Sequence, residues 1–205
     1  YLDVSDRRFH CWKRSGHGNV ALGEALRESC DVYFYDLAMK VGIDKISAMA
    51  ERFGLGLRYD LPLSGIAHGL NPSRAWKETV RGEPWVIGDT VNASIGQGYV
   101  QTSPLQLAVM TARLASGKDI EPRLVKSVNG IETPNPEPAS MGIDPGQLRR
   151  VQRGMYDVST HRRGTAYGSR IIEDAFRMAG KTGTSQVRDI TAAERASGVI
   201  RNEDL

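Results

Sequence analysis

The residue types with the clearest chemistry lie in one stretch, residues 178–186, whose centre is Lys181-Thr182-Gly183-Thr184. We predict a short strand here, and a strand would place the lysine and the glycine on one face and the two threonines on the other. Gly183 has no side chain, so a substrate or another backbone could approach closely. A cation beside hydroxyl groups and an approachable backbone suits an anionic ligand that carries an amide. A surface strand with these residue types by chance is the competing interpretation, so the hypothesis needs partners elsewhere in the chain.

A second candidate is Ser29-Cys30-Asp31, at the junction of two predicted helices. A hydroxyl and a carboxylate two positions apart at a helix start can turn into one site. Asp31 as a helix N-cap is the simpler interpretation of the same residues. The pairing with Lys181 favours the functional one, because Ser-x-Asp followed much later by Lys-Thr-Gly is the order of the second and third motifs in penicillin-recognising serine enzymes. Here the separation is 152 positions (181 minus 29).

Further segments make this likeness specific, and they follow in order from Phe9 to about Val187. They are Cys11-Trp12-Lys13, Gly16-His17-Gly18, Glu28 to Tyr35, Trp76-Lys77, Pro84-Trp85, Gly88-Asp89-Thr90, Ile95 to Tyr99, Thr102 to Gln106 and Lys181 to Thr184. Because of these segments, the chain resembles a class B penicillin-binding protein of the elongation type, which builds the cylindrical wall of rod-shaped bacteria. Asp31 supports that type, because division-type relatives usually carry Asn there.

The resemblance implies a peptidoglycan D,D-transpeptidase that cross-links stem peptides through a serine acyl-enzyme and is inhibited covalently by β-lactams. In that family a Ser-x-x-Lys motif supplies the nucleophile and its base. None of the seven lysines in this chain has a serine three positions earlier. The resemblance therefore places the nucleophile upstream of Tyr1, and we expect this fragment alone to be inactive.

The resemblance also implies catalytic roles for three residues. Ser29 and Asp31 would line the site, with the Ser29 hydroxyl in the proton-relay network around the upstream lysine. Lys181 would attract the substrate electrostatically and help to orient that network.

Three residues would bind the substrate, again by resemblance. Thr182 and Thr184 would hydrogen-bond the terminal carboxylate of a D-Ala-D-Ala end or of a β-lactam. The backbone N–H of Thr184 would form half of an oxyanion hole, a kind of donor whose removal costs about 100- to 1000-fold in rate. Gly183 would leave room for the substrate to pair with this edge through its main chain.

A third candidate group consists of the two cysteines, Cys11 and Cys30, and of His17 between them in the sequence. A periplasmic location would allow a disulfide. Two unconnected thiols, or a structural zinc site with Cys11, His17 and Cys30 as ligands, are the other interpretations. Structural zinc normally has four ligands, and the fourth could be Asp3 or a residue upstream of Tyr1. A metal here would brace the second motif against the preceding loop, while the chemistry itself would need no cofactor.

Composition limits the location and the partners. The chain has 205 residues and a net charge of +3, without a long basic run, so nothing indicates nucleic-acid binding. No apolar stretch approaches the roughly 18 residues of a membrane-spanning helix. The resemblance implies an inner-membrane anchor outside this chain, with the present residues in the periplasm. It also implies a membrane glycosyltransferase of the rod system and the elongation scaffold as partners.

Helices and strands must position these groups, and helical periodicity in the sequence predicts where the helices lie. Helices first and strands later predict an α+β domain. The expected helices cover residues 20–29, 31–41, 44–54, 105–116 and 144–158, with a strand at 121–128, a turn at Asn129-Gly130 and an irregular segment at 55–103. The resemblance implies an antiparallel sheet flanked by helices, with a helical subdomain. We expect residues 1–187 to be part of one transpeptidase domain: a loop at 1–19, a helical subdomain with long loops at 20–117 and a sheet-side region at 118–187. A mobile polar tail would follow at 188–205.

Two other functions remain open at the level of sequence. A serine β-lactamase of the same superfamily is one, although no deacylating Glu motif is identifiable. A sensor or scaffold domain that has kept the fold and lost the nucleophile is the other. The three aromatic residues Trp76, Trp85 and Tyr99 either wall a peptide groove or anchor the long loop, whereas Gly96-Gln97-Gly98 is predicted to form a tight turn that supports the site.

Overall fold

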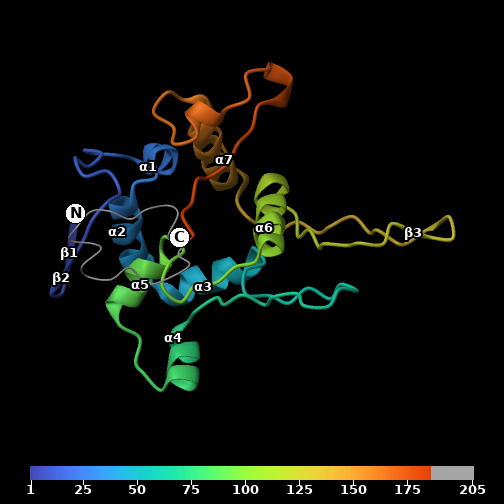
Figure 1. Ribbon diagram of the computed structural model, residues 1–205, viewed down its shortest axis with the longest axis horizontal. Helices are drawn as coiled ribbons and strands as arrows, with labels where there is room; N and C mark the ends of the chain where they lie inside the picture. Colours follow the sequence, from blue (N-terminus) through green and yellow to red (C-terminus); the bar gives the residue numbers. More distant parts are fainter. Residues whose placement is uncertain (186–205) are drawn as a thin grey trace.

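A computed structural model describes residues 1–185 of the chain (Figure 1). The helices are α1 (Leu22–Glu28), α2 (Asp31–Val41), α3 (Ile43–Arg52), α4 (Arg74–Trp76), the π-helix η1 (Lys77–Arg81), α5 (Ile87–Ala93), α6 (Pro104–Ser116), α7 (Pro145–Thr160) and the 3-10 turns η2 (Tyr167–Ser169) and η3 (Asp174–Phe176). The strands are β1 (Leu2–Val4), β2 (Arg7–Phe9), β3 (Ser127–Val128) and β4 (Ile131–Glu132). The five long predicted segments of helix are therefore confirmed, as α1, α2, α3, α6 and α7. Among the described residues, no helix is both long and apolar enough to span a bilayer.

Helices α1 and α7 pack closely, although they are far apart in the sequence (Figure 1). A Cβ built on Gly154 of α7 would lie 2.7 Å from a side-chain carbon of Leu26 in α1. Only a glycine permits this approach, because a methyl group there would overlap the leucine. The contact brings the end of α7 beside the end of α1, where Ser29 lies.

The segment 1–19, expected to be irregular, begins with an antiparallel ribbon that pairs Leu2 with Phe9 and Val4 with Arg7. The ribbon packs on α2 because Val4 joins Tyr35 and Val91 in one buried apolar cluster. Three-residue strands give little periodic signal, which explains why the pattern of residues did not predict them. The ribbon fixes the start of the loop that carries Cys11 and Trp12.

The segment 55–103 is less irregular than expected, because it contains α4, η1 and α5. These helices are too short for a sustained apolar period. A buried ion pair joins them: the Lys77 ammonium, on a residue only 4% exposed, lies 2.7 Å from the Asp89 carboxylate. That hydrogen bond raises the pKa of Lys77, so the lysine stays charged inside the protein. The pair ties η1 to α5, which ends next to the cavity described below.

Helix α6 organises the loops around it through one buried amide. Ser103 caps the helix by accepting a hydrogen bond from the backbone N–H of Gln106, and the Gln106 side chain accepts one in return from Ser103. The Gln106 amide also donates to the backbone carbonyls of Leu57 and His68. Because Gln106 is fully buried, these bonds are needed to satisfy its polar atoms.

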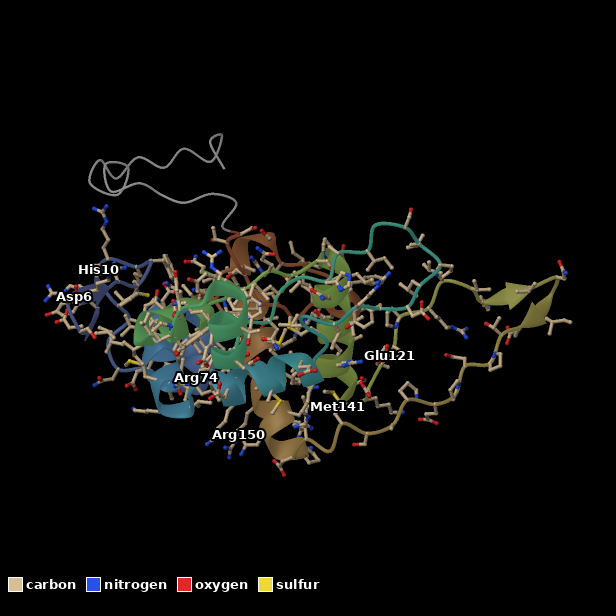
Figure 2. All side chains as sticks on the ribbon, turned by 90° about the horizontal axis from the view of Figure 1, so that it is seen from below. Asp6, His10, Arg74, Glu121, Met141 and Arg150 are labelled. Carbon is tan, nitrogen blue, oxygen red and sulfur yellow. The ribbon has the colours of Figure 1, made fainter. Side chains whose placement is uncertain are left out.

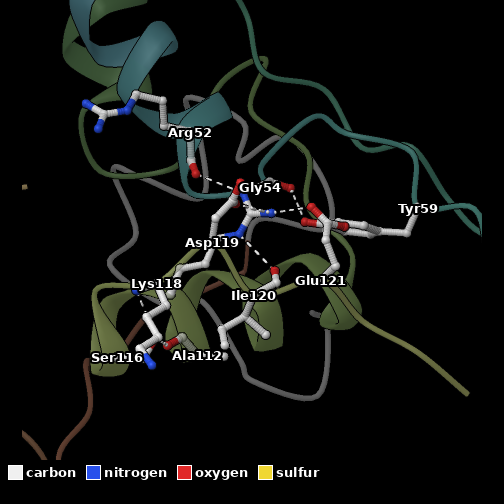
Figure 3. A network of polar contacts seen from close by, with 10 residues as sticks. Arg52, Gly54, Tyr59, Ala112, Ser116, Lys118, Asp119, Ile120 and Glu121 are labelled. Carbon is white, nitrogen blue, oxygen red and sulfur yellow. Dashed lines mark hydrogen bonds and ion pairs between the residues drawn. The ribbon is translucent and has the colours of Figure 1, made fainter. Parts of the chain in front are cut away.

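A second buried polar group, Arg113, holds the C-terminal end of α6. Figure 3 labels its partners Arg52, Asp119, Ile120 and Glu121. The Arg113 guanidinium donates to the carbonyls of Arg52 and Ile120 and pairs with Asp119 at 2.8 Å and Glu121 at 2.7 Å. These partners come from α3 and from the segment after α6, so one side chain fastens three parts of the chain. The fork of a guanidinium suits this role.

The predicted strand 121–128 is wrong over most of its length, because only Ser127–Val128 is a strand. It pairs with Ile131–Glu132 across Asn129-Gly130, both at positive φ, so the predicted hairpin turn is confirmed. The hairpin projects from the helical body (Figures 1 and 2). Residues 121–126 have no strand partner among the described residues, and an extended segment becomes a strand only by pairing.

The predicted strand around Lys181 is also wrong, because residues 177–185 have no strand pairing. No other strand of the described chain pairs with them. The backbone of Met178 and Gly180 bonds to α7 instead, and the Thr182 hydroxyl bonds to Thr165 in the turn that follows α7. The expected tail at 188–205, together with Gln186 and Val187, lies outside the described residues.

Candidate functional site

The two candidate motifs meet at one cavity of about 800 Å³. One wall comes from the junction of α1 and α2, another from the turn after α5, and a third from the segment of Lys181. The residues that line it are Trp12, Leu26, Ser29, Asp31, Phe34, Ser94, Ile95, Gln97, Thr165, Lys181, Thr182, Gly183 and Thr184. The six residues predicted for catalysis and substrate binding are therefore all together.

Ser29 is held at the helix junction in an unusual backbone conformation. It ends α1 in the left-handed region, with φ 53°, which few residues other than glycine adopt. The N–H of Cys30 donates to the carbonyl of Ala25, which closes the end of the helix. Backbone strain of this kind persists where surrounding structure fixes it, and here it aims the Ser29 hydroxyl into the cavity.

Lys181 reaches across the cavity to this hydroxyl. Its ammonium donates to the Ser29 Oγ at 2.7 Å and to the backbone carbonyl of Thr182 at 2.9 Å. Although Lys181 is exposed along the cavity, partial removal of its ammonium from water lowers its pKa, and the negative charge of Asp31 opposes that effect. A lysine that loses its proton more easily than usual, beside a serine hydroxyl, is equipped to move protons.

Asp31 is not the N-cap of α2, because the helix starts at Asp31 itself and Cys30 occupies the cap position. The simpler interpretation of Asp31 is therefore wrong. Its carboxylate instead accepts a hydrogen bond of 2.9 Å from the backbone N–H of Trp12. A carboxylate in the first turn is also stabilised by the helix dipole. Asp31 thus attaches the loop of Cys11 and Trp12 to the wall of the cavity.

The Lys181 segment is attached to α7 and its following turn by single hydrogen bonds. The Ser159 hydroxyl donates to the carbonyl of Met178, and the N–H of Gly180 donates to the carbonyl of Met155 at 3.1 Å. Residues 181–184 all line the cavity, so the expected division of this segment between two faces is wrong. Alternation requires an extended paired strand, which these residues do not form.

Several lining residues were not predicted from the sequence. The exposed indole of Trp12 donates to the Ser29 carbonyl at 2.8 Å and lines the cavity. Thr165 and Gln97 add polar groups, and Phe34 adds an aromatic ring. The quoted motif segments already contain Trp12, Phe34 and Gln97, so position within a motif was the available signal. Thr165 lies outside them and carried no signal.

The expected turn at Gly96-Gln97-Gly98 is confirmed, since both glycines have positive φ, 77° and 72°. It presents Gln97 to the cavity. The aromatic residues of the long loop anchor it and do not line the cavity: Trp76 packs on Tyr99 with ring centroids 5.2 Å apart, and Trp85 donates to the Thr90 hydroxyl.

Cys11, His17 and Cys30 come together as predicted, with their ligand atoms all within 4.8 Å of one another. The Cys11 sulfur lies 3.4 Å from His17 Nδ1, while the buried His17 Nε2 has no hydrogen-bond partner. Burial and then the charge of Lys13 lower the pKa of His17, which favours the neutral imidazole that binds metals. Asp3 does not join the group, because it pairs with Arg8 at 2.7 Å. Of the two alternatives for a fourth ligand, Asp3 is therefore wrong, and a residue upstream of Tyr1 stays a prediction.

Burial raises the pKa of the Cys30 thiol, and the nearby Cys11 acts in the same direction. Without a cation, the thiol therefore keeps its proton more firmly than a free cysteine. A bound cation reverses this preference, since it stabilises the thiolate. The two sulfurs and one nitrogen are a donor set that fits zinc.

Comparison with protein families identifies the family of this chain. Residues 2–198 match the model of the penicillin binding protein transpeptidase domain. The chain is 37% identical to the peptidoglycan D,D-transpeptidase MrdA of Haemophilus influenzae over 201 residues, which cover 95% of this chain and 31% of that protein. The chain thus belongs to the penicillin-binding protein transpeptidase family, as the motifs predicted. It spans about a third of the length of the curated relatives that it matches.

Solved structures show the same α+β fold. The crystal structure of Pseudomonas aeruginosa PBP2 in complex with WCK 5153 matches with a TM-score of 0.81 and 43% identity, over 91% of this chain and 43% of that chain. Helicobacter pylori PBP2 in its complex with MreC matches with a TM-score of 0.79 and 34% identity, over 91% of this chain and 34% of that chain. The predicted transpeptidase fold is confirmed.

Proposed function

We propose that the protein containing this chain is a peptidoglycan D,D-transpeptidase that cross-links stem peptides through a serine acyl-enzyme and is acylated by β-lactams. The observation that carries the proposal is the 2.7 Å hydrogen bond from Lys181 to Ser29 across the cavity. It joins residues 152 positions apart, which lie in the two motifs that the family pattern pairs. The relative's name supports the same activity.

Ser29 of the second motif and Lys181 of the third act together in proton transfer. Ser29, bonded to Lys181, relays a proton between the leaving amine and the base beside the nucleophile, which the family motif places upstream of Tyr1. Lys181 supplies positive charge where an anionic substrate enters and where negative charge develops in the transition state. Burial lowers the pKa of Lys181, and the negative charge of Asp31 partly opposes that shift.

The segment after Lys181 binds the substrate. The hydroxyl groups of Thr182 and Thr184 hold the terminal carboxylate of a D-Ala-D-Ala end or of a β-lactam. The backbone N–H of Thr184 stabilises the oxyanion together with the N–H of the nucleophile. Gly183, whose added Cβ would meet nothing within 4 Å, leaves open space for the peptide.

The decisive experiment is an intact-mass measurement on the natural full-length protein after brief exposure to benzylpenicillin. A stable adduct of one drug mass, formed much more slowly by a Ser29→Ala variant, is the expected result. Ser116→Ala, on the exposed end of α6, is the matched control and reacts at the normal rate.

Two other results distinguish the rival functions. Rapid turnover of the drug without a lasting adduct identifies a β-lactamase. No reaction of a folded sample, with intact Ser29 and Lys181, identifies a sensor or scaffold domain that has lost the nucleophile. Either result contradicts the transpeptidase proposal.

We also infer that Cys11, His17 and Cys30 bind a structural zinc ion. The proximity of their ligand atoms and the unpartnered His17 Nε2 support this inference. The ion would brace the second motif, since Cys30 lies between Ser29 and Asp31. The ion would have a structural role and no part in catalysis, because the proton relay uses the protein's own groups.

Metal analysis of protein purified without chelator tests the zinc site. We expect about one zinc per chain, lost in a Cys11→Ser variant and retained in His68→Ala, and a lower melting temperature after chelation. Well under one zinc per chain contradicts the inference. Thiol titration then separates the two remaining interpretations, a disulfide and free cysteines.

Location and partners follow from the same proposal. We place residues 1–187 in one periplasmic transpeptidase domain of a protein anchored in the inner membrane. A membrane glycosyltransferase of the rod system and the elongation scaffold are the proposed protein partners, and the H. pylori PBP2 complex with MreC supports the second. Co-purification of the natural protein with each partner tests these contacts.

A further inference from the structure

Thr165, which lies outside the motif segments quoted above, contacts the proposed carboxylate-binding hydroxyl directly. The Thr165 and Thr182 Oγ1 atoms are 2.7 Å apart, and both residues line the cavity. We propose that Thr165 is a positioning residue that orients the Thr182 hydroxyl toward the substrate carboxylate, and that an ion pair between Glu28 and Arg163 holds Thr165 in place. This inference rests on the proposed transpeptidase function.

The chemistry of a hydroxyl group explains why the contact matters. Each threonine hydroxyl has one proton to donate and lone pairs to accept. When Thr165 donates to Thr182, the Thr182 proton is free to point at an anion in the cavity. A carboxylate accepts and cannot donate, so this is the arrangement that its binding requires. Either hydroxyl can be the donor in this pair, and a bound carboxylate selects the arrangement in which Thr165 donates to Thr182 and Thr182 donates to the carboxylate.

The turn that carries Thr165 is fastened to the end of α1. The Arg163 guanidinium pairs with the Glu28 carboxylate at 2.8 Å, and the N–H of Thr165 donates to the carbonyl of Arg27 at 3.2 Å. Arg27 also pairs with the other oxygen of Glu28, at 2.6 Å. Glu28 is only 4% exposed, so these partners are needed to keep its charge buried.

The same helix end therefore serves both sides of the cavity. Glu28 directly precedes Ser29, which bonds Lys181, and it also fixes the turn whose Thr165 bonds Thr182. Glu28, the last residue of α1, and Ser29, its C-cap, thus both link the second motif to the side of the third.

The test is a double-mutant cycle on the natural full-length protein, with the acylation rate by benzylpenicillin as the readout. We expect Thr165→Val to slow acylation roughly 10-fold, as the loss of one hydrogen bond implies, and Thr165→Ser to restore the rate to within about twofold. Because Thr165 acts through Thr182, adding Thr165→Val to a Thr182→Val protein should cause no further loss.

A second variant tests the support of the turn. Arg163→Gln removes one of the two cationic partners of Glu28. Arg27 still pairs with the buried carboxylate, and the Arg163 side chain is 57% exposed, so the variant is expected to fold. We expect a loss of roughly threefold in acylation, again absent in the Thr182→Val background.

Three results would overturn the inference: an unchanged rate in Thr165→Val, additive losses in the double variant, or no rescue by serine. If Thr165→Val fails to fold, the Arg163→Gln cycle decides by the same criterion. Failure of the transpeptidase proposal itself is a different observation, because then the unmodified protein forms no lasting adduct.

Discussion

Ser29 and Asp31 lie at the junction of two regular helices, whereas Lys181 and Thr182 lie on a segment without secondary structure. The first pair is fixed by the backbone hydrogen bonds that end α1 and start α2. The second is fixed by isolated contacts to α7 and its following turn, made by Met178, Gly180 and Thr182. One side of the cavity is therefore determined by local structure, and the other by tertiary contacts.

This difference predicts which side of the cavity is more sensitive to substitutions that remove a hydrogen bond. A helix junction keeps its conformation when one hydrogen bond is removed, because the other hydrogen bonds of the two helices still hold the backbone. A segment held by single bonds shifts when any one of them is lost. Displacement by about 1 Å is enough to cost roughly 100-fold in an enzyme, so the weaker side should control the rate.

The largest effect is expected at Gly164, in the turn that supports the weaker side. A Cβ built on it would lie 2.2 Å from the carbonyl oxygen of Val158 and 2.5 Å from that of Asp157. Gly164→Ala must therefore move backbone, and we expect a loss of about 3 kcal/mol in the free energy of unfolding. Gly168→Ala, where nothing lies within 4 Å, is the control. Equal melting temperatures for the two variants would show that the turn is freely adjustable.

The contact between the two sides comes next. Lys181→Met keeps the apolar stem and removes the charged donor to Ser29, so acylation by benzylpenicillin should fall roughly 10- to 150-fold, the range for a hydrogen bond from a charged group. The melting temperature should change little. Lys126→Met, on the projecting hairpin, is the control. A rate within twofold of normal would mean that the two sides work independently.

The same contrast explains what the sequence could predict. The helices on the Ser29 side have clear apolar periods, so their existence and approximate ends were predictable. The Lys181 segment has no such period, and its motif supplied the residues without their conformation. The strand predicted there requires a partner that residues 1–185 do not provide, and short-range patterns contain no information on pairing between distant segments.

Individual tertiary contacts escaped prediction for the same reason. Thr165 and Gly164 look like ordinary turn residues in the sequence. Only the folded structure brings Thr165 to the cavity and sets Gly164 against the backbone at the end of α7. Cys11, His17 and Cys30 were predictable as a group because their residue types are chemically distinctive. The alternative with Asp3 as a fourth ligand was wrong, because the Asp3 carboxylate has a closer cationic partner in Arg8.

A smaller effect is expected at Ser159, whose hydroxyl donates to the Met178 carbonyl and is 1% exposed. Ser159→Ala leaves that carbonyl without its donor, at a cost of about 1 kcal/mol in stability. Acylation should slow roughly fivefold, because the segment before Lys181 is released. Ser116→Ala removes a hydroxyl that bonds within its own helix and serves as the control. Losses of equal size in both variants would contradict a special role for the Met178 contact.

The most subtle test concerns the pH dependence of acylation, through the charge on Lys181. Desolvation lowers the pKa of Lys181 below its ordinary value, and Asp31 partly restores it. If protonated Lys181 is the active form, the rate should decline on the alkaline side, starting below the pH expected for a free lysine. Asp31→Asn removes the opposing negative charge, so the pKa falls further and the decline moves to lower pH. A profile that does not move in Asp31→Asn would mean that the helix junction does not tune the lysine, and that the two sides of the cavity are coupled only through Ser29.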